Sequence, residues 1–176
     1  MDNHVKHICI TGPESTGKST VTKLMANRFL VESASEYARE YLSVCQTYEY
    51  EDLLKIARGQ QEIINKVASR SKSLFFSDTD LLTIIIWSKY LFGKVDIEIY
   101  RTWKESLPDR YLLCAVDIPW EEDPLREHPH QREEIFDIYK THIENSGVPY
   151  ELVQGDRRTF VEIYDFGQKL MVLPKS

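Results

Sequence analysis

Gly12-Pro13-Glu14-Ser15-Thr16-Gly17-Lys18-Ser19-Thr20 is the stretch that decides the fold of this chain. It has the pattern G-x-x-x-x-G-K-S, and it lies between the apolar run from Val5 to Thr11 and a helical repeat that ends at about Phe29. Glycines at both ends of the pattern let the backbone curl, so that successive N–H groups point at phosphate oxygens. A flexible surface turn would need neither the strand nor the helix. The stretch therefore predicts a phosphate-binding loop and a nucleoside triphosphate as ligand.

Two side chains of this loop have predicted tasks of their own. Lys18 can reach the β- and γ-phosphates as a point charge, and the hydroxyl of Ser19 can bind Mg²⁺. The helix that begins at about Lys18 adds the positive end of its dipole. We expect every residue from Gly12 to Thr20 to bind ATP, with Lys18 also acting in catalysis and Ser19 also acting as a metal ligand.

The bulk composition is that of a globular enzyme domain. The 176 residues suit one domain, and a content of 42% hydrophobic and 28% charged residues argues against disorder. The net charge of −6 argues against nucleic acid as the main ligand. No apolar run approaches the roughly 18 residues of a membrane span, and the first residues leave no room for a signal peptide. We expect one domain over residues 1–176, cytoplasmic, with a small-molecule substrate and no membrane partner.

Apolar runs alternate with helical repeats along the chain. Strands are predicted at 5–11, 30–34, 73–78, 111–117 and 150–154, and helices at 18–29, from 35, 50–71, 81–92, 96–107, 132–145 and 158–171. This alternation predicts parallel βαβ units in an α/β fold: a three-layer α/β/α P-loop NTPase fold with a central, mainly parallel five-stranded sheet. The polar, proline-containing residues 119–132 predict a lid-like loop. Cys9, Cys45 and Cys114 are predicted to be buried free thiols.

Acidic side chains are predicted at the edge where parallel strands end, which is where ligands bind in such sheets. Asp78 closes one strand, and a carboxylate there orients Mg²⁺ directly or through water. Aspartate and threonine are also good helix N-caps, so we expect Asp78 to serve the metal or catalysis while Thr79 or Asp80 caps the next helix. Glu36 or Asp80 would accept the proton of an attacking hydroxyl.

Arginines complete the predicted site. Arg39 could hold a phosphate or a sugar, although a solvated helix face that pairs Glu36 with Arg39 is equally open. Arg126 and Arg132 of the lid-like loop would stabilise charge on the γ-phosphate as the loop closes and excludes water. The alternative is a surface loop whose arginines pair with nearby acids. Asp156 follows the last predicted strand, where an adenine ring would be bounded. His128 and His130 lack a third ligand and predict no metal site.

The chain as a whole resembles the ribosylnicotinamide kinase domain at the C-terminal end of the bifunctional, NadR-type bacterial NAD-biosynthesis and regulator proteins, a P-loop kinase and AAA-type ATPase-like family. The matching stretches are G-P-E-S-T-G-K-S-T at 12–20, E-Y-A-R-E-Y at 36–41, D-L-L-K-I-A-R-G-Q at 52–60, D-T-D at 78–80 and I-P-W-E-E-D-P-L-R at 118–126. The resemblance implies a nucleoside- or nucleotide-kinase-like fold. It also implies phosphoryl transfer from ATP to nicotinamide riboside in NAD salvage, with Mg²⁺ as a cofactor.

The same resemblance implies a set of acceptor-binding residues, namely Glu36, Tyr37, Arg39, Asp80 and Trp120. Two positions depart from the family's pattern: Ser35 stands where the family has a tryptophan before E-Y-G-R, and Ala38 stands where it has the motif's glycine. The acceptor is therefore left open, and another nucleoside, a nucleotide or a sugar is the alternative. An alternative of a different class is a P-loop ATPase that acts as a nucleotide-dependent switch or regulator. The sequence predicts no particular oligomeric state.

Overall fold

The computed structural model describes residues 4–45, 47–123, 126, 128 and 130–155. Five parallel strands form one sheet in the order β2-β3-β1-β4-β5. The strands are β1 (Lys6–Thr11), β2 (Ser33–Ala34), β3 (Leu74–Asp78), β4 (Arg110–Cys114) and β5 (Tyr150–Val153). The helices are α1 (Lys18–Phe29), α2 (Tyr37–Cys45), α3 (Tyr50–Arg70), α4 (Leu81–Phe92), α5 (Ile97–Glu105) and α6 (Arg132–Ser146).

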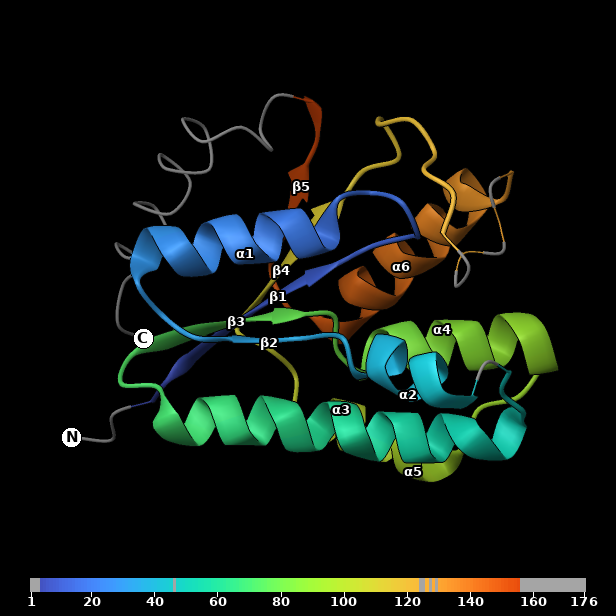
Figure 1. The fold of residues 1–176 in the computed structure, drawn as a ribbon, viewed down its shortest axis with the longest axis horizontal. Helices are drawn as coiled ribbons and strands as arrows, with labels where there is room; N and C mark the ends of the chain where they lie inside the picture. The colour runs from blue at the N-terminus through green and yellow to red at the C-terminus, as the bar shows by residue number, and fades with distance from the viewer. Residues whose placement is uncertain (1–3, 46, 124–125, 127, 129, 156–176) are drawn as a thin grey trace.

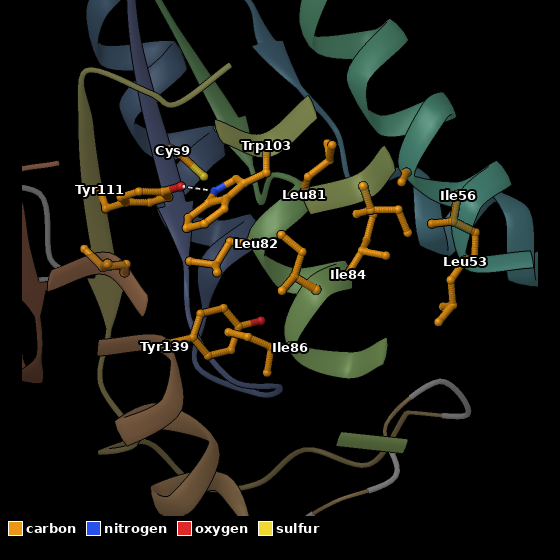
Figure 2. Close-up of a cluster of buried hydrophobic side chains, with 14 of the residues drawn as sticks. Cys9, Leu53, Ile56, Leu81, Leu82, Ile84, Ile86, Trp103, Tyr111 and Tyr139 are labelled. Atoms are coloured by element: carbon orange, nitrogen blue, oxygen red, sulfur yellow. Dashed lines mark hydrogen bonds between the residues drawn. The ribbon is translucent and has the colours of Figure 1, made fainter. Parts of the chain in front are cut away.

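Helices cover both faces of the sheet, which confirms the predicted three-layer α/β/α fold (Figure 1). Side chains alternate between the faces of each strand. Ile8 and Ile10 of β1 pack with Val21 and Met25 of α1 on one face. Cys9, between them, belongs to the larger cluster on the opposite face, which is built from α3, α4, α5 and α6 (Figure 2). Among the described residues, no helix combines the length and the apolar character needed to cross a membrane.

Three predictions need correction, two about strands and one about the burial of a cysteine. The strand predicted at 30–34 is only Ser33–Ala34, because Leu30 adopts a left-handed conformation that ends α1, and the N–H of Val31 donates to the carbonyl of Ala26 at 3.0 Å. The strand predicted at 111–117 ends at Cys114, after which the N–H of Ala115 still donates to the carbonyl oxygen of Val153 in β5 at 2.9 Å. Cys45 is exposed, whereas Cys9 and Cys114 are buried as expected. The helix predicted at 158–171 lies outside the described residues.

The register of the sheet gathers the strand ends that carry the predicted site. Ile10 of β1 lies opposite Asp78 of β3, and Thr11 lies opposite Leu113 of β4. The chain leaves β1 through Gly12, whose φ is +137° and where an added Cβ would lie 2.8 Å from the carbonyl oxygen of Cys114. The phosphate loop therefore crosses directly over the end of β4, and only glycine permits that approach.

Replacing Gly12 by alanine tests this close approach. Gly93, which ends α4 with φ +69° and has no atom within 4 Å of an added Cβ, offers the matched control. Both Gly12→Ala and Gly93→Ala impose a left-handed conformation on alanine, but only the first also forces a side chain against the backbone of β4. We expect Gly12→Ala to lower the free energy of unfolding in urea by about 1–3 kcal/mol more than Gly93→Ala. Equal losses would contradict the close packing of the loop on β4.

A buried histidine makes the stability of the fold depend on pH. His7 is 8% exposed, its Nε2 lies 2.8 Å from Oγ of Ser77, and its ring stacks on Phe75 with centroids 4.5 Å apart. Burial lowers the pKa of His7 to about 4, although the carboxylate of Asp109 acts in the opposite direction. The unfolded chain, with an ordinary histidine pKa, therefore takes up a proton first as the pH falls.

The stabilisation by neutral His7 is complete above the unfolded pKa and is lost as the pH falls from about 6.5 toward about 4. Asp80 acts with the opposite sign, because burial raises its pKa to about 6. We therefore compare the wild type with His7→Gln, in which Asp80 is unchanged. Between about pH 7.5 and about pH 5, the wild type should lose more free energy of urea unfolding than His7→Gln. Parallel losses in the two proteins would contradict this.

Candidate active site

A cavity of about 630 Å³ joins most of the predicted site residues. The phosphate loop forms one part of its wall, through Gly12 and the residues from Glu14 to Thr20. Side chains of α2, α3 and α4 form another part, and three residues that follow β4 in the chain, Ile118, Glu121 and Arg126, also line it. The cavity is therefore shared by the phosphate loop, the E-Y-A-R segment and the lid-like loop.

The loop has the backbone conformation of an anion-binding site. Ser15 has a φ of +53° and Gly17 a φ of +81°, so the chain turns sharply before α1. Gly17 is the N-cap of α1 and offers no capping side chain to the first turn of the helix. The backbone N–H groups of that turn, together with the helix dipole, favour a bound phosphate.

Lys18 lies across this loop. Its Nζ donates to the carbonyl oxygen of Pro13 at 2.7 Å, and the hydroxyl of Thr16 donates to the same oxygen at 2.8 Å. Lys18 also lines the cavity, whereas Pro13 contributes a carbonyl oxygen that fixes the shape of the loop. The positive charge of Lys18 is thus held where phosphate oxygens would enter the loop.

Glu36 interacts electrostatically with both Lys18 and a second carboxylate, that of Asp78. Glu36 lines the cavity and pairs with Nε of Arg39 at 3.3 Å. Burial raises the pKa of Glu36, Lys18 lowers it, and the charge of Asp78 raises it again. Asp78 itself is 6% exposed, is not a lining residue, and its Oδ1 has no hydrogen-bond partner among the described residues. A buried carboxylate oxygen without a partner is costly unless a ligand satisfies it.

The oxygen atoms present suit Mg²⁺. Ser19 lines the cavity, and Asp78 offers the unpaired oxygen on the strand next to β1. Mg²⁺ prefers such hard oxygen ligands, and it usually binds through one or two protein groups together with phosphate oxygens and water. Within the described part of the chain, no group of three or more histidine, cysteine, aspartate or glutamate side chains could hold a metal ion alone. The donor set therefore fits a metal that arrives with a nucleotide.

The lid-like loop is anchored on the phosphate loop through Ser15. The hydroxyl of Ser15 accepts the N–H of Glu121 at 2.9 Å and a guanidinium N–H of Arg126 at 3.3 Å. Arg126 also donates to the carbonyl oxygen of Glu121 at 2.6 Å, which fixes the turn between them. Of the two predicted lid arginines, Arg126 is therefore the one that the structure brings into the cavity.

Arg132 lies beside the loop and not among the residues that line the cavity. Its guanidinium donates to the carbonyl oxygens of Ser15 and Ile118, each at 3.1 Å, and stacks on the ring of Trp120 at 5.6 Å. These backbone contacts occupy the side chain that we expected at the γ-phosphate. Trp120, expected to bind the acceptor, supports Arg132 instead. Arg132 therefore holds the backbone of the phosphate loop at Ser15, and Trp120 packs against Arg132.

Two other predicted acceptor residues also point elsewhere. Oδ1 of Asp80 accepts the N–H of Leu82 at 3.1 Å, so Asp80 is the N-cap of α4, as one of the two predictions for it stated. The residue is 3% exposed and does not line the cavity, which leaves Glu36 as the candidate base. Tyr37 packs against Gly59 of α3, where an added Cβ would lie 2.2 Å from its ring. Asp156 lies outside the described residues.

Gln60 fixes the start of the E-Y-A-R segment. Its side-chain oxygen accepts the N–H of Tyr37 at 2.8 Å, and its Nε2 donates to the carbonyl oxygen of Ser35 at 3.2 Å. Arg39, two residues after Tyr37 in the first turn of α2, pairs with Asp123 of the lid-like loop at 3.0 Å. The E-Y-A-R segment is thus tied to α3 by Gln60 and to the lid-like loop by Asp123, two residues that lie far from it in the sequence.

The sequence analysis missed the aromatic part of the cavity wall. Tyr48, Trp87 and Phe92 all line it, and Tyr48 meets Phe92 edge-on at 6.4 Å. The run 81–92 is apolar on nearly every side, so its periodicity predicts a core helix and does not show which residues border a cavity. No local sequence signal separates Trp87 from its neighbours; the structure does, because Trp87 is only partly buried between the buried Ile86 and Ser88.

Comparison with known proteins places the chain in a family. A family model described as "AAA domain" matches residues 7–159. The "Trifunctional NAD biosynthesis/regulator protein NadR" of Salmonella typhimurium is 32% identical over 127 residues, which make up 69% of this chain and 31% of that protein. The chain therefore spans about a third of the length of the curated relatives it matches. The resemblance seen in the motifs is thus confirmed at the level of aligned sequence.

Solved structures show the same fold. A NadR protein in complex with NR has a TM-score of 0.80 at 16% identity, and one in complex with NAD and AMP-PNP has 0.73 at 18%. Each comparison covers 98% of this chain and about half of the other, 52% and 51%. Thymidylate kinase from Ehrlichia chaffeensis has a TM-score of 0.64 at 14% identity over 95% of this chain and 97% of its own. The fold is thus that of the P-loop nucleoside and nucleotide kinases, and because the family model extends from β1 past the end of β5, the chain belongs to the AAA domain family.

Proposed function

We propose that residues 1–176 form a kinase domain that transfers the γ-phosphoryl group of ATP to a nucleoside-like acceptor, and that nicotinamide riboside is this acceptor. The product would be nicotinamide mononucleotide, in NAD salvage. One observation carries the proposal: a single cavity joins a phosphate loop to an aromatic wall, with the carboxylate of Glu36 in the same lining. The free thiols of Cys9 and Cys45 support a cytoplasmic location.

The donor half would bind ATP along the phosphate loop. Backbone N–H groups from Gly12 to Thr20 would bind its phosphates, and Lys18 would exchange the carbonyl of Pro13 for phosphate oxygens. Arg126, already held on Ser15, would place positive charge beside the transferred group as it leaves ADP. Ser19 and Asp78 would hold Mg²⁺, which when bound neutralises charge on the β- and γ-phosphates.

The acceptor half would hold a flat ring against the aromatic wall. Tyr48, Trp87 and Phe92 offer aromatic surface that replaces the family's tryptophan at position 35. Glu36 would accept the proton of the attacking hydroxyl, and its raised pKa makes it a better base than an exposed glutamate. Arg39 would orient the acceptor, and its pairing with Asp123 would close the lid-like loop over both substrates.

The similarity to NadR supports both ligands, since crystal structures of NadR proteins hold NR in one case and NAD with AMP-PNP in another. Because Ser35 removes the expected stacking residue, a different nucleoside is the second candidate within the same class. A nucleotide-dependent switch is the rival from another class, and it would require no acceptor. An acceptor-dependence assay separates all three.

Purified protein with ATP, Mg²⁺ and nicotinamide riboside should form nicotinamide mononucleotide, measured by chromatography. Glu36→Gln should lower kcat by about 10²–10⁴-fold, because the proton of the acceptor loses its base. Glu98→Gln is the matched control, since Glu98 also pairs with an arginine, Arg58, but on the exposed side of α5. If the protein phosphorylates only another nucleoside, the assignment of the substrate changes and the assignment as a kinase remains. If the protein hydrolyses ATP and no acceptor stimulates the hydrolysis, the proposed kinase activity is contradicted.

The two lid arginines should differ in their effects. Arg126→Ala removes charge from the cavity and should lower kcat by about 10²-fold with little change in KM for the acceptor, because the contact forms in the transition state. Arg132→Ala removes two hydrogen bonds to the backbone and the stacking on Trp120, so it should lower Tm and weaken ATP binding. Steady-state kinetics and thermal unfolding of both variants measure this. A kcat for Arg126→Ala equal to that of the wild type would remove Arg126 from the mechanism.

A further inference from the structure

Three buried side chains from three elements form a polar chain inside the apolar core. Nε1 of Trp103 donates to the hydroxyl of Tyr111 at 3.0 Å, and this hydroxyl donates to Oδ2 of Asp80 at 2.5 Å. All three residues are at most 3% exposed, and Figure 2 shows Trp103 and Tyr111 meeting beside Cys9. Burying polar groups is costly unless they are paired, so such a network needs a structural or functional reason.

The helix cap explains only one oxygen of Asp80. Oδ1 accepts the N–H of Leu82 and caps α4. An asparagine or serine would cap the helix as well, without placing a carboxylate in the core. Oδ2 takes no part in the cap and accepts the hydrogen bond from Tyr111 instead. This second oxygen ties the start of α4 to β4.

The residue before Asp80 has a conformation that needs support. Thr79 has a φ of +69°, in the left-handed region that β-branched residues rarely adopt. Such strain persists only where the surroundings determine the conformation. The N–H of Thr79 donates to the carbonyl oxygen of Ile10 at 2.9 Å, which holds the turn on one side. The bond between Asp80 and Tyr111 holds it on the other.

Asp78 directly precedes this turn. It is the last residue of β3, and its buried Oδ1 has no hydrogen-bond partner in the described part of the chain. Because no donor holds Oδ1, the direction of this oxygen depends on the backbone of Asp78. That backbone is held on one side by the pairing of β3 with β1 and on the other by the turn at Thr79.

We propose that Tyr111 is a positioning residue, which acts through Asp80 and the turn at Thr79 to hold Asp78 in the direction that a Mg²⁺–nucleotide complex requires. The inference rests on the proposed function, in which Asp78 is a metal ligand. It gives β4 two tasks, because the carbonyl of Cys114 meets the phosphate loop at Gly12 three residues further along the strand.

The variant Tyr111→Phe removes one hydroxyl and leaves the ring in the core. The affinity for AMP-PNP is measured by calorimetry with and without Mg²⁺. We expect the metal-free affinity to be unchanged, while the gain in affinity that Mg²⁺ produces falls roughly tenfold. The kcat should fall by a similar factor, with KM for the acceptor unchanged.

Ser88→Ala is the matched control, because it also removes a buried hydroxyl, one that donates to the carbonyl of Lys94 at 2.7 Å and has no contact with Asp80. It should lower Tm to a similar extent and leave the Mg²⁺-dependent gain as in the wild type. A double variant tests the route: adding Tyr111→Phe to Asp80→Ser, which keeps a helix cap but loses the oxygen facing Tyr111, should reduce this gain no further than Asp80→Ser alone.

An unchanged Mg²⁺-dependent gain in Tyr111→Phe would overturn the inference and leave the tyrosine a stability role only. If Mg²⁺ does not change the nucleotide affinity of the wild type, both the inference and the proposed metal site are overturned. A wild type that shows the gain but phosphorylates no nucleoside would contradict the proposed function alone. If Tyr111→Phe does not fold, Asp80→Ser keeps a cap on α4 but removes the oxygen that accepts from Tyr111, and it should show the same loss of the Mg²⁺-dependent gain; an unchanged gain would overturn the inference.

Discussion

Parallel pairing of β1 with β3 on one side and β4 on the other is the constraint on which the rest of the structure depends. The register sets Ile10 beside Asp78 and Thr11 beside Leu113, so the three strands end at one edge. The phosphate loop leaves this edge, and the turn at Thr79 and the chain toward the lid-like loop start from it. A shift of register would separate the acid from the loop even if every side chain were kept.

The cavity at this edge is built from contacts between segments that are distant in sequence. Ser15 accepts hydrogen bonds from Glu121 and Arg126, more than a hundred residues further along the chain, and Arg39 reaches Asp123. These contacts place the lid-like loop against both the phosphate loop and α2. Charge is concentrated in these segments, whereas the wall at Tyr48, Trp87 and Phe92 carries none. The division matches a ligand with an anionic end and a flat, uncharged or delocalised end.

The architecture could be predicted from the sequence because local patterns of residues determine its main elements. The glycine spacing from 12 to 17 and the acid after an apolar strand place the phosphate loop and Asp78 without any knowledge of tertiary contacts. Asp80 shows the limit of such reasoning: its partner Tyr111 is 31 residues away, and only packing decides that the carboxylate turns into the core. Arg132 shows it again, because no local pattern distinguishes an arginine that reaches a phosphate from one that binds loop carbonyls. Trp87 and Phe92 of the aromatic wall were missed because a helix that is apolar on nearly every side gives no periodic signal for the residues that border a cavity.

Two of the stretches that carry the family resemblance are one structural unit. Gly59 leaves room for the ring of Tyr37, and the next residue, Gln60, binds the N–H of Tyr37 and the carbonyl of Ser35. The segment 36–41 thus owes its conformation to the segment 52–60. Their joint occurrence in a distant sequence counts as one match and not as two, because a change in either would demand a compensating change in the other. Ser35 contacts Gln60 through its backbone carbonyl, so the hydrogen bond that holds this unit together does not depend on the side chain at position 35.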